Sequence, residues 1–183
     1  MATEMEGPNG LEDALRELRA EHRAAQEELE EASQLVERAG RSLDEVALDF
    51  LYRGDTIRVT VGDRSWTGTV VHVGVGVMTL RTPSKVEVDI AYPGVTSMRV
   101  VERARVGGRS RTSKHPGEIV ARLRELQNSS EEVQVGGRHL PPIEGTVQVV
   151  ARSHVELRGR DGSEWVVPLS ELDYLSRAGE SSR

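Results

Sequence analysis

The stretch Gly68–Arg81, GTVVHVGVGVMTLR, decides the fold, because the chain contains a second version of it at Gly145–Arg158, GTVQVVARSHVELR. Both stretches are 14 residues long, and they agree without a gap at Gly, Thr, Val, a later Val, Leu and Arg. Self-similarity of this kind indicates a repeated architecture. The sequence therefore predicts two copies of one small β module, and the repeat itself supplies no active site.

Length and composition limit the class of protein. The chain has 183 residues, which is room for two small domains and an extension, and it contains no cysteine. The missing cysteine excludes a disulfide framework and a thiolate metal site. The first residues are polar and acidic, and no apolar run approaches the roughly 20 residues that span a bilayer. We therefore predict a cytoplasmic protein with no membrane contact and no cofactor.

An acidic helical arm is predicted over residues 1–41. This segment holds 11 acidic and 5 basic side chains, whereas residues 42–183 hold 19 of each. Small and apolar residues recur along the arm at alternating steps of four and three, a heptad pattern that favours a coiled coil. The predicted oligomerisation positions are Leu11, Leu15, Leu18, Ala25, Leu29, Ala32 and Val36. The alternative is a helix that folds back on the rest of the chain.

The first β module is predicted over residues 42–102. Ser42 and Glu45 form a capping box at the start of a short helix, and Gly54 ends that helix. In residues 56–61 apolar side chains alternate with polar ones, which indicates a strand with one wet face. Further apolar stretches, separated by turns that contain Gly or Pro, bring the module to about five strands.

The second module is predicted over residues 116–176 and repeats the plan of a short helix followed by strands. Pro116 suits the first turn of the helix. A strand begins at Ile143, and residues 160–162 form a tight turn. Residues 177–183 are predicted to be a disordered tail. The expected fold class is α+β, mainly β, with a long coiled-coil-like helix followed by two tandem helix-plus-five-strand barrels.

The short helix followed by five strands, with Gly68 inside a long second strand, resembles the Sm-like barrel and more loosely other SH3-like barrels. A glycine there permits the bend that wraps five strands into a barrel. RNA-binding members of the Sm-like family carry an Asp and an Asn after this glycine. The first copy has Gly74 and Met78 at those places, and the second has Ala151 and Val155. The resemblance therefore implies two small barrels without the RNA pocket of the family.

A basic linker is predicted over residues 103–115, which contain no acidic residue. Such a segment favours salt-dependent binding of phosphate, so RNA or DNA binding is the alternative function. The candidate nucleic-acid contacts are Arg99, Arg103, Arg105, Arg109, Arg111 and Lys114. The linker has no aromatic residue that could stack on bases. A solvated tether drawn to the acidic arm would account for the same charges.

The sequence contains no catalytic or metal-binding motif. Its five histidines lie apart, without HxH, HxxxH or HExxH spacing, and no GxSxG occurs. The aromatic residues expected to be core or interface anchors are Phe50, Tyr52, Trp66, Tyr92, Trp165 and Tyr174. We therefore expect a non-enzymatic, oligomeric interaction or regulatory adaptor, whose arm binds a protein partner or a second copy of the chain.

Overall fold

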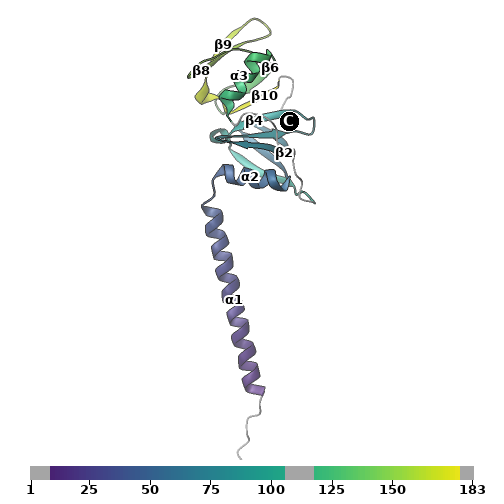
Figure 1. Cartoon of the computed structure of the whole chain (residues 1–183), viewed down its shortest axis with the longest axis vertical. Coiled ribbons are helices and arrows are strands. Elements are labelled where there is room, and N and C mark those ends of the chain that lie inside the picture. The colour runs from purple at the N-terminus through teal and green to yellow at the C-terminus, as the bar shows by residue number, and fades with distance from the viewer. Residues whose placement is uncertain (1–8, 106–117, 178–183) are drawn as a thin grey trace, which may run out of the picture. The chain divides into compact units, whose positions relative to one another are not determined.

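The computed structural model describes residues 9–105 and 118–177, with side chains from Leu15 onward (Figure 1). It divides into two compact units, residues 1–41 and residues 42–183. The helix α1 spans Asn9–Ala39 in the first unit. The second unit combines two short helices with an antiparallel sheet, so the prediction of a long helix and an α+β fold is confirmed at that level.

The second unit contains the same succession of elements twice. The first half holds α2 (Leu43–Arg53), β1 (Thr56–Val61), β2 (Arg64–Gly74), β3 (Val77–Arg81), β4 (Glu87–Ala91), the 3₁₀ turn η1 (Tyr92–Gly94) and β5 (Ser97–Glu102). The second half holds α3 (Ile119–Ser129), β6 (Glu132–Gly136), β7 (Ile143–Val150), β8 (His154–Arg158), β9 (Glu164–Pro168), the 3₁₀ turn η2 (Leu169–Glu171) and β10 (Tyr174–Arg177). The strand β10 includes Arg177, the first residue of the predicted tail.

The described strands of both halves form one ten-stranded sheet in the order β5-β1-β2-β3-β4-β10-β6-β7-β8-β9. Within each half the last strand lies beside the first, so the two halves have the same strand order. The two separate barrels expected from the sequence are not what the structure shows. The pairing of β4 with β10 joins the two halves edge to edge, and the sheet is open because its end strands, β5 and β9, do not pair with each other within the described chain.

Gly68 and Gly145, the first residues of the repeated stretches, lie at equivalent places in β2 and β7. A Cβ atom on Gly68 would collide with the backbone carbonyl of Arg81, the last residue of the same stretch. A Cβ atom on Gly145 would collide in the same way with the carbonyl of Arg158. The repeat therefore preserves a close approach of two backbones that only glycine permits.

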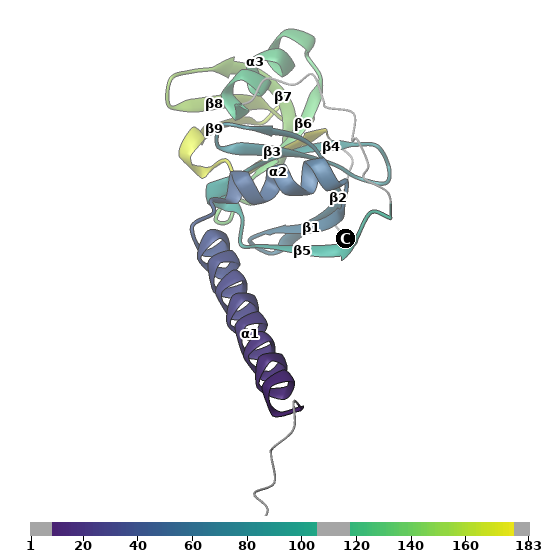
Figure 2. The same ribbon diagram turned by 60° about the horizontal axis from the view of Figure 1, so that its bottom comes forward.

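Each half has its own hydrophobic core, to which its own short helix contributes, and the ribbon shows α2 lying against the strands of the first half (Figure 2). The helix α2 packs against β2, and α3 packs against β7. The strand β1 confirms the predicted alternation, because Ile57, Val59 and Val61 are buried whereas Arg58 is exposed. The core of the second half contains Leu123, Leu126, Val133, Val135, Ile143, Val147, Val155, Leu157, Val167, Leu172 and Leu175.

The helix α2 has the caps that the sequence predicts. The backbone N–H of Ser42 donates to a carboxylate oxygen of Glu45 at 2.8 Å. Gly54, with a φ of 72°, donates its N–H to the carbonyl of Phe50 at 2.9 Å. The helix α3 begins differently, because no capping box is found at its N-cap residue Glu118 within the described chain. The first short helix is therefore closed by its own sequence more completely than the second.

Candidate interaction sites

The junction between the two halves is the antiparallel pairing of β4 with β10. Three residue pairs face each other there: Ile90 with Tyr174, Asp89 with Leu175, and Val88 with Ser176. The ladder continues beyond β10, because the N–H of Ala91 donates to the carbonyl of Asp173 at 2.9 Å. No pattern in the sequence indicates this pairing, which makes one continuous sheet out of two repeated modules.

Side chains of β10 anchor the junction by alternating between the two cores. Tyr174 is 1% exposed and belongs to the core of the first half, whereas the next residue, Leu175, belongs to the core of the second. The ring of Tyr174 packs on Trp66 with 4.6 Å between centroids and 55° between planes. Burial raises the pKa of Tyr174 to about 12, so the phenol is neutral near pH 7. The second half thus completes the core of the first.

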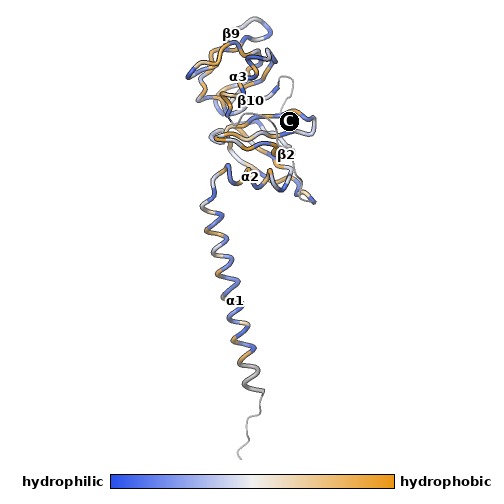
Figure 3. The backbone as a smooth tube through the Cα atoms, viewed as in Figure 1, coloured by the Kyte–Doolittle hydropathy of each residue, from blue (hydrophilic) through white to orange (hydrophobic). Residues whose placement is uncertain are grey.

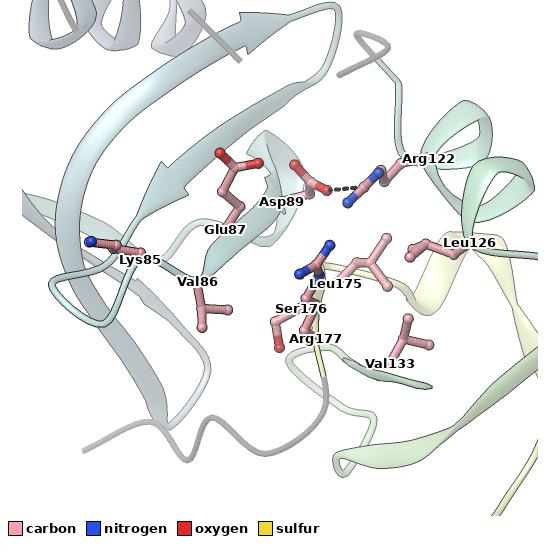
Figure 4. A pocket seen from close by; sticks show the side chains of 10 residues that line it. All are labelled: Lys85, Val86, Glu87, Asp89, Arg122, Leu126, Val133, Leu175, Ser176 and Arg177. Atoms are coloured by element: carbon pink, nitrogen blue, oxygen red, sulfur yellow. Dashed lines mark ion pairs between the residues drawn. The ribbon is translucent and has the colours of Figure 1, made fainter. Parts of the chain in front are cut away.

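A buried ion pair crosses the junction (Figure 4). Asp89 of β4 is 6% exposed, and its Oδ2 atom lies 3.5 Å from Nε of Arg122 in α3. The hydroxyl of Thr79 donates to Oδ1 of the same carboxylate at 2.6 Å. Removing one member of such a pair would leave a buried charge uncompensated. The pair therefore holds α3 of the second half against β4 of the first.

A cavity of about 290 Å³ lies beside this ion pair, between β4, β10 and α3 (Figure 4). Its wall carries both signs of charge, including Lys85, Glu87 and Arg177. The hydroxyl of Ser176 is buried without a hydrogen-bond partner in the described chain. No histidine lines the cavity to activate that hydroxyl, so the lining residues contain no pair of a serine nucleophile with a histidine base.

Apolar residues recur among hydrophilic ones along α1 (Figure 3), and the large apolar side chains of the predicted stripe are exposed. The exposed fractions of its large side chains are 44% at Leu15, 63% at Leu18, 71% at Leu29 and 74% at Val36. Ala25 and Ala32 are exposed as well, and the side chain of Leu11 lies outside the described part of the chain. Leu35, 71% exposed, was not predicted as part of the stripe because it falls between the heptad steps.

The described part of the predicted basic segment lies at and after the edge strand β5. Arg99 on β5 is exposed, and so are Arg103 and Arg105 after it. Arg58 of β1 lies opposite Arg99 and is also exposed. It was not among the predicted nucleic-acid contacts, because the alternation of residues 56–61 indicated only a polar position of a strand. The remaining predicted contacts lie outside the described residues: Arg109, Arg111 and Lys114.

The six aromatic residues divide into four that are buried and two that are exposed. The buried ones are Phe50, Trp66, Tyr92 and Tyr174. Tyr52 is 73% exposed and Trp165 is 44% exposed, so neither belongs to a core. The indole N–H of Trp165, on the edge strand β9, donates to the hydroxyl of Ser163 at 2.9 Å. Trp165 therefore presents an apolar ring at an edge of the sheet.

Comparison with known proteins assigns no family to the chain. No model of a protein family matches it, and neither the curated proteins nor the solved structures contain a match. Among residues 9–105 and 118–177, no group of three or more His, Cys, Asp or Glu side chains could hold a metal ion. No helix in those ranges is both long and apolar enough to span a membrane. The cytoplasmic location and the lack of catalysis stay predictions from sequence.

Proposed function

We propose that the chain is a non-enzymatic interaction adaptor that self-associates through α1. The observation that carries this proposal is the stripe of exposed leucine and valine side chains, which repeats at heptad spacing along a helix of 31 residues. A single straight helix cannot bury such a stripe against itself, and a second helix with the same spacing covers it by knobs-into-holes packing. A coiled coil between copies of the chain is therefore the occupant that the pattern fits.

The charge of the arm sets how this association should respond to salt. Residues 1–41 carry 11 acidic and 5 basic side chains, so two arms repel each other at low ionic strength. Salt screens that repulsion within about 10 Å at 0.1 M. Alanine at Ala25 and Ala32 also makes the seam weaker than one built from leucine throughout. We expect modest self-association that becomes tighter as the salt concentration rises.

The two halves of the sheet would be the surfaces that α1 brings together. We propose that each half is an Sm-like or SH3-like module, and the strand order shared by both halves supports this reading. The absence of the family's Asp and Asn from both copies favours a protein partner over RNA at the repeated stretch. In this proposal the arm sets the oligomeric state, and the sheet edges and loops bind the partner.

Size-exclusion chromatography with light scattering tests the role of α1. The full-length chain, with a subunit mass of 20.2 kDa, should elute as an oligomer whose mass rises with protein concentration. A variant with Leu18→Glu and Leu29→Glu should elute at a lower mass than the wild-type chain at each concentration because a charge replaces a seam residue at two places. The matched control, Ala20→Glu with Gln34→Glu, adds the same charge on the opposite face of the helix and should stay oligomeric. A wild-type chain that is monomeric at every concentration and salt level would contradict the proposal.

RNA or DNA binding is the second candidate function, and the group of exposed arginines at the β5 edge favours it. Arg58 and Arg99 lie opposite each other on adjacent strands, and Arg103 and Arg105 come directly after the end of β5. Each phosphate contact made by such a side chain releases counterions. This binding would weaken with salt, whereas coiled-coil association would strengthen, so the two functions respond oppositely to the same variable.

Fluorescence anisotropy with labelled single-stranded RNA and duplex DNA tests the second candidate. Affinity should fall steeply between about 50 mM and 200 mM salt. A triple variant, Arg99→Gln, Arg103→Gln and Arg105→Gln, should reduce the slope of log affinity against log salt by about 0.9 per lost DNA phosphate contact. The control replaces three other exposed arginines, Arg38, Arg124 and Arg152, with Gln and should keep the slope. The absence of binding at the lower salt concentration would remove this function.

A further inference from the structure

The two edge strands of the open sheet, β5 and β9, are the structural counterparts of the two strands that meet at its internal junction, β10 and β4. The strand β9 holds the place in the second half that β4 holds in the first, and β5 holds the place in the first half that β10 holds in the second. The strands β4 and β10 pair with each other, whereas β9 and β5 each pair on one side only within the described chain. Each of the two strands that form the junction thus has an equivalent strand in the other half, and these two equivalents, β5 and β9, lie unpaired on their outer sides at opposite ends of the sheet.

The register of the sheet fixes which residues correspond. Glu87 of β4 lies opposite Arg81, and Glu164 of β9 lies opposite Arg158, the last residues of the two repeated stretches. The residues after them therefore correspond in order: Val88 to Trp165, Asp89 to Val166, and Ile90 to Val167. Pairing with β1 and β6 relates the other two strands in the same way: Ser97 to Tyr174, Met98 to Leu175, and Arg99 to Ser176.

The charged pair of the internal junction is replaced by an apolar pair at the two edges. Asp89 corresponds to Val166 of β9. The helices α2 and α3 precede β1 and β6 by the same spacing, which makes Val46 the counterpart of Arg122. Val46 packs partly buried against the first core. Valine therefore stands at the places of both members of the ion pair. The two edges at opposite ends of the sheet are thus both apolar at these places, whereas the internal junction has opposite charges there.

Exposure distinguishes the free edge from its paired counterpart. Val88 and Asp89 are 0% and 6% exposed in the internal junction, whereas Trp165 and Val166 are 44% and 67% exposed. Unpaired edge strands are usually protected by charged side chains and proline; β9 has Glu164 and Pro168 at its two ends, yet between them it presents an exposed tryptophan and an exposed valine. Pro168 occupies the place of Ala91 and has no N–H, so a ladder on β9 contains one hydrogen bond fewer than the internal one.

We propose that β9 pairs with β5 of another copy of this chain and reproduces the internal junction between molecules. In the inherited register Val167 lies opposite Ser97, Val166 opposite Met98, and Trp165 opposite Arg99. Val166 then packs toward Val46 of the next copy, and the indole of Trp165 lies beside the Arg99 guanidinium, where a cation–π contact stabilises it. The contact joins two different surfaces, so each added copy presents a further free edge. This surface is separate from the stripe on α1.

Disulfide crosslinking tests the register directly, because the chain has no cysteine of its own. Two single-cysteine variants of the full-length chain are prepared, Trp165→Cys and Arg99→Cys, mixed in equal amounts and oxidised. Residues opposite each other in an antiparallel pair have Cα atoms about 4.5–5.5 Å apart, within the range that a disulfide spans. We expect a covalent heterodimer that exceeds the homodimers formed by either variant alone. Replacing Arg99→Cys by Arg58→Cys, one strand further in, should remove it.

The valine pair supplies the second measurement. Adding Val166→Asp to the Trp165→Cys chain should lower the heterodimer yield at least about tenfold, because it places a carboxylate against Val46 without a partner. Adding Val46→Arg to the Arg99→Cys chain should restore the yield by rebuilding the Asp–Arg pair of the internal junction. The matched control is Val75→Asp, at an 83% exposed valine in the β2–β3 turn, and should leave the yield unchanged.

The same crosslinking is repeated in chains that also carry Leu18→Glu and Leu29→Glu. A heterodimer that persists there supports edge pairing whether or not α1 self-associates, so the two proposals fail separately. Edge pairing is overturned if the mixed variants give no heterodimer above the homodimer level. It is equally overturned if Val166→Asp and Val75→Asp lower the yield to the same extent, since the contact would then not involve β9.

Discussion

The two halves of the sheet share a strand order and a repeated sequence, but they fill their cores with different side chains. The first core contains the aromatic residues Phe50, Trp66 and Tyr92, and it is completed by Tyr174 from the other half. The described core of the second half is wholly aliphatic, and its own tryptophan, Trp165, lies on the free edge. The framework of the module has therefore been kept in both copies, whereas their edges have taken different roles.

This difference shows that the first half depends on the second more than the reverse. Polar contacts run in both directions, because the side chain of Arg64 in the first half donates to Gln134 of β6 at 2.8 Å. Arg138 of the second half likewise donates to the carbonyl of Pro93. The second half receives no aromatic anchor in return. Perturbing the junction should therefore damage the first core first.

The largest expected effect comes from Tyr174→Ala. Removing a buried aromatic side chain costs about 3–5 kcal/mol, and here the cavity opens in the first half although the substituted residue belongs to the second. Urea unfolding of the full chain should show that loss, and the fluorescence of Trp66, measured with Trp165→Phe in the background, should report early loosening of the first core. Tyr52→Ala, at a residue 73% exposed, should change stability by less than about 0.5 kcal/mol. Equal effects of the two substitutions would refute the shared core.

The next largest effect comes from the two glycines of the repeat. Gly68→Ala and Gly145→Ala each place a methyl group against a backbone carbonyl, that of Arg81 or of Arg158. The strands must separate to accept it, and overpacking of this kind costs about 2–3 kcal/mol. Urea midpoints of the two variants should fall by similar amounts. A large loss at one glycine with none at the other would break the equivalence of the two copies.

A loss of similar size should appear at high pH through Tyr174. Its pKa lies at about 12 in the folded chain, above the ordinary value of 10.0, because burial disfavours the phenolate. Below pH 10 the phenol is protonated in both the folded and the unfolded chain, so its full contribution to the free energy of unfolding is present. From pH 10 to pH 12 the phenol loses its proton in the unfolded chain but keeps it in the folded chain. The free energy of unfolding should therefore decrease by up to about 1.4 kcal/mol per pH unit in that window. Tyr174→Phe should flatten the profile, although Tyr92, whose pKa burial also raises, leaves a residual slope.

Much of each module could be predicted from local sequence. The alternation in residues 56–61 predicted β1, and the Ser42–Glu45 capping box and Gly54 predicted the ends of α2. These features depend on neighbours within a few residues, where periodicity and backbone conformation leave a direct signal. The repeat also identified two equivalent modules, and both halves do have the same strand order.

The junction could not be predicted, because strand pairing between modules leaves no local pattern. Asp89 and Leu175 are partners in the sheet although they lie far apart in the sequence, and nothing in their flanking residues distinguishes that edge from a free one. The scarcity of aromatic residues predicted both Tyr174 and Tyr52 to be anchors, yet Tyr174 is buried and Tyr52 is exposed. Arg58 was passed over for the same reason, since its neighbour across the sheet, Arg99, is distant in sequence.

The smallest predicted effect contrasts the starts of α2 and α3. Ser42→Ala removes the side-chain half of the capping box of α2, while the bond from the N–H of residue 42 to Glu45 remains, and should cost about 1 kcal/mol. At the corresponding place α3 has Glu118, whose side chain makes no cap hydrogen bond in the described structure. Glu118→Ser should therefore add about 0.5 kcal/mol by satisfying an N–H group of the first turn. Thermal unfolding followed by circular dichroism measures both changes. If Glu118→Ser gives no gain while Ser42→Ala gives its loss, then the N-terminus of α3 is already capped, and the two helices are closed equally by different means.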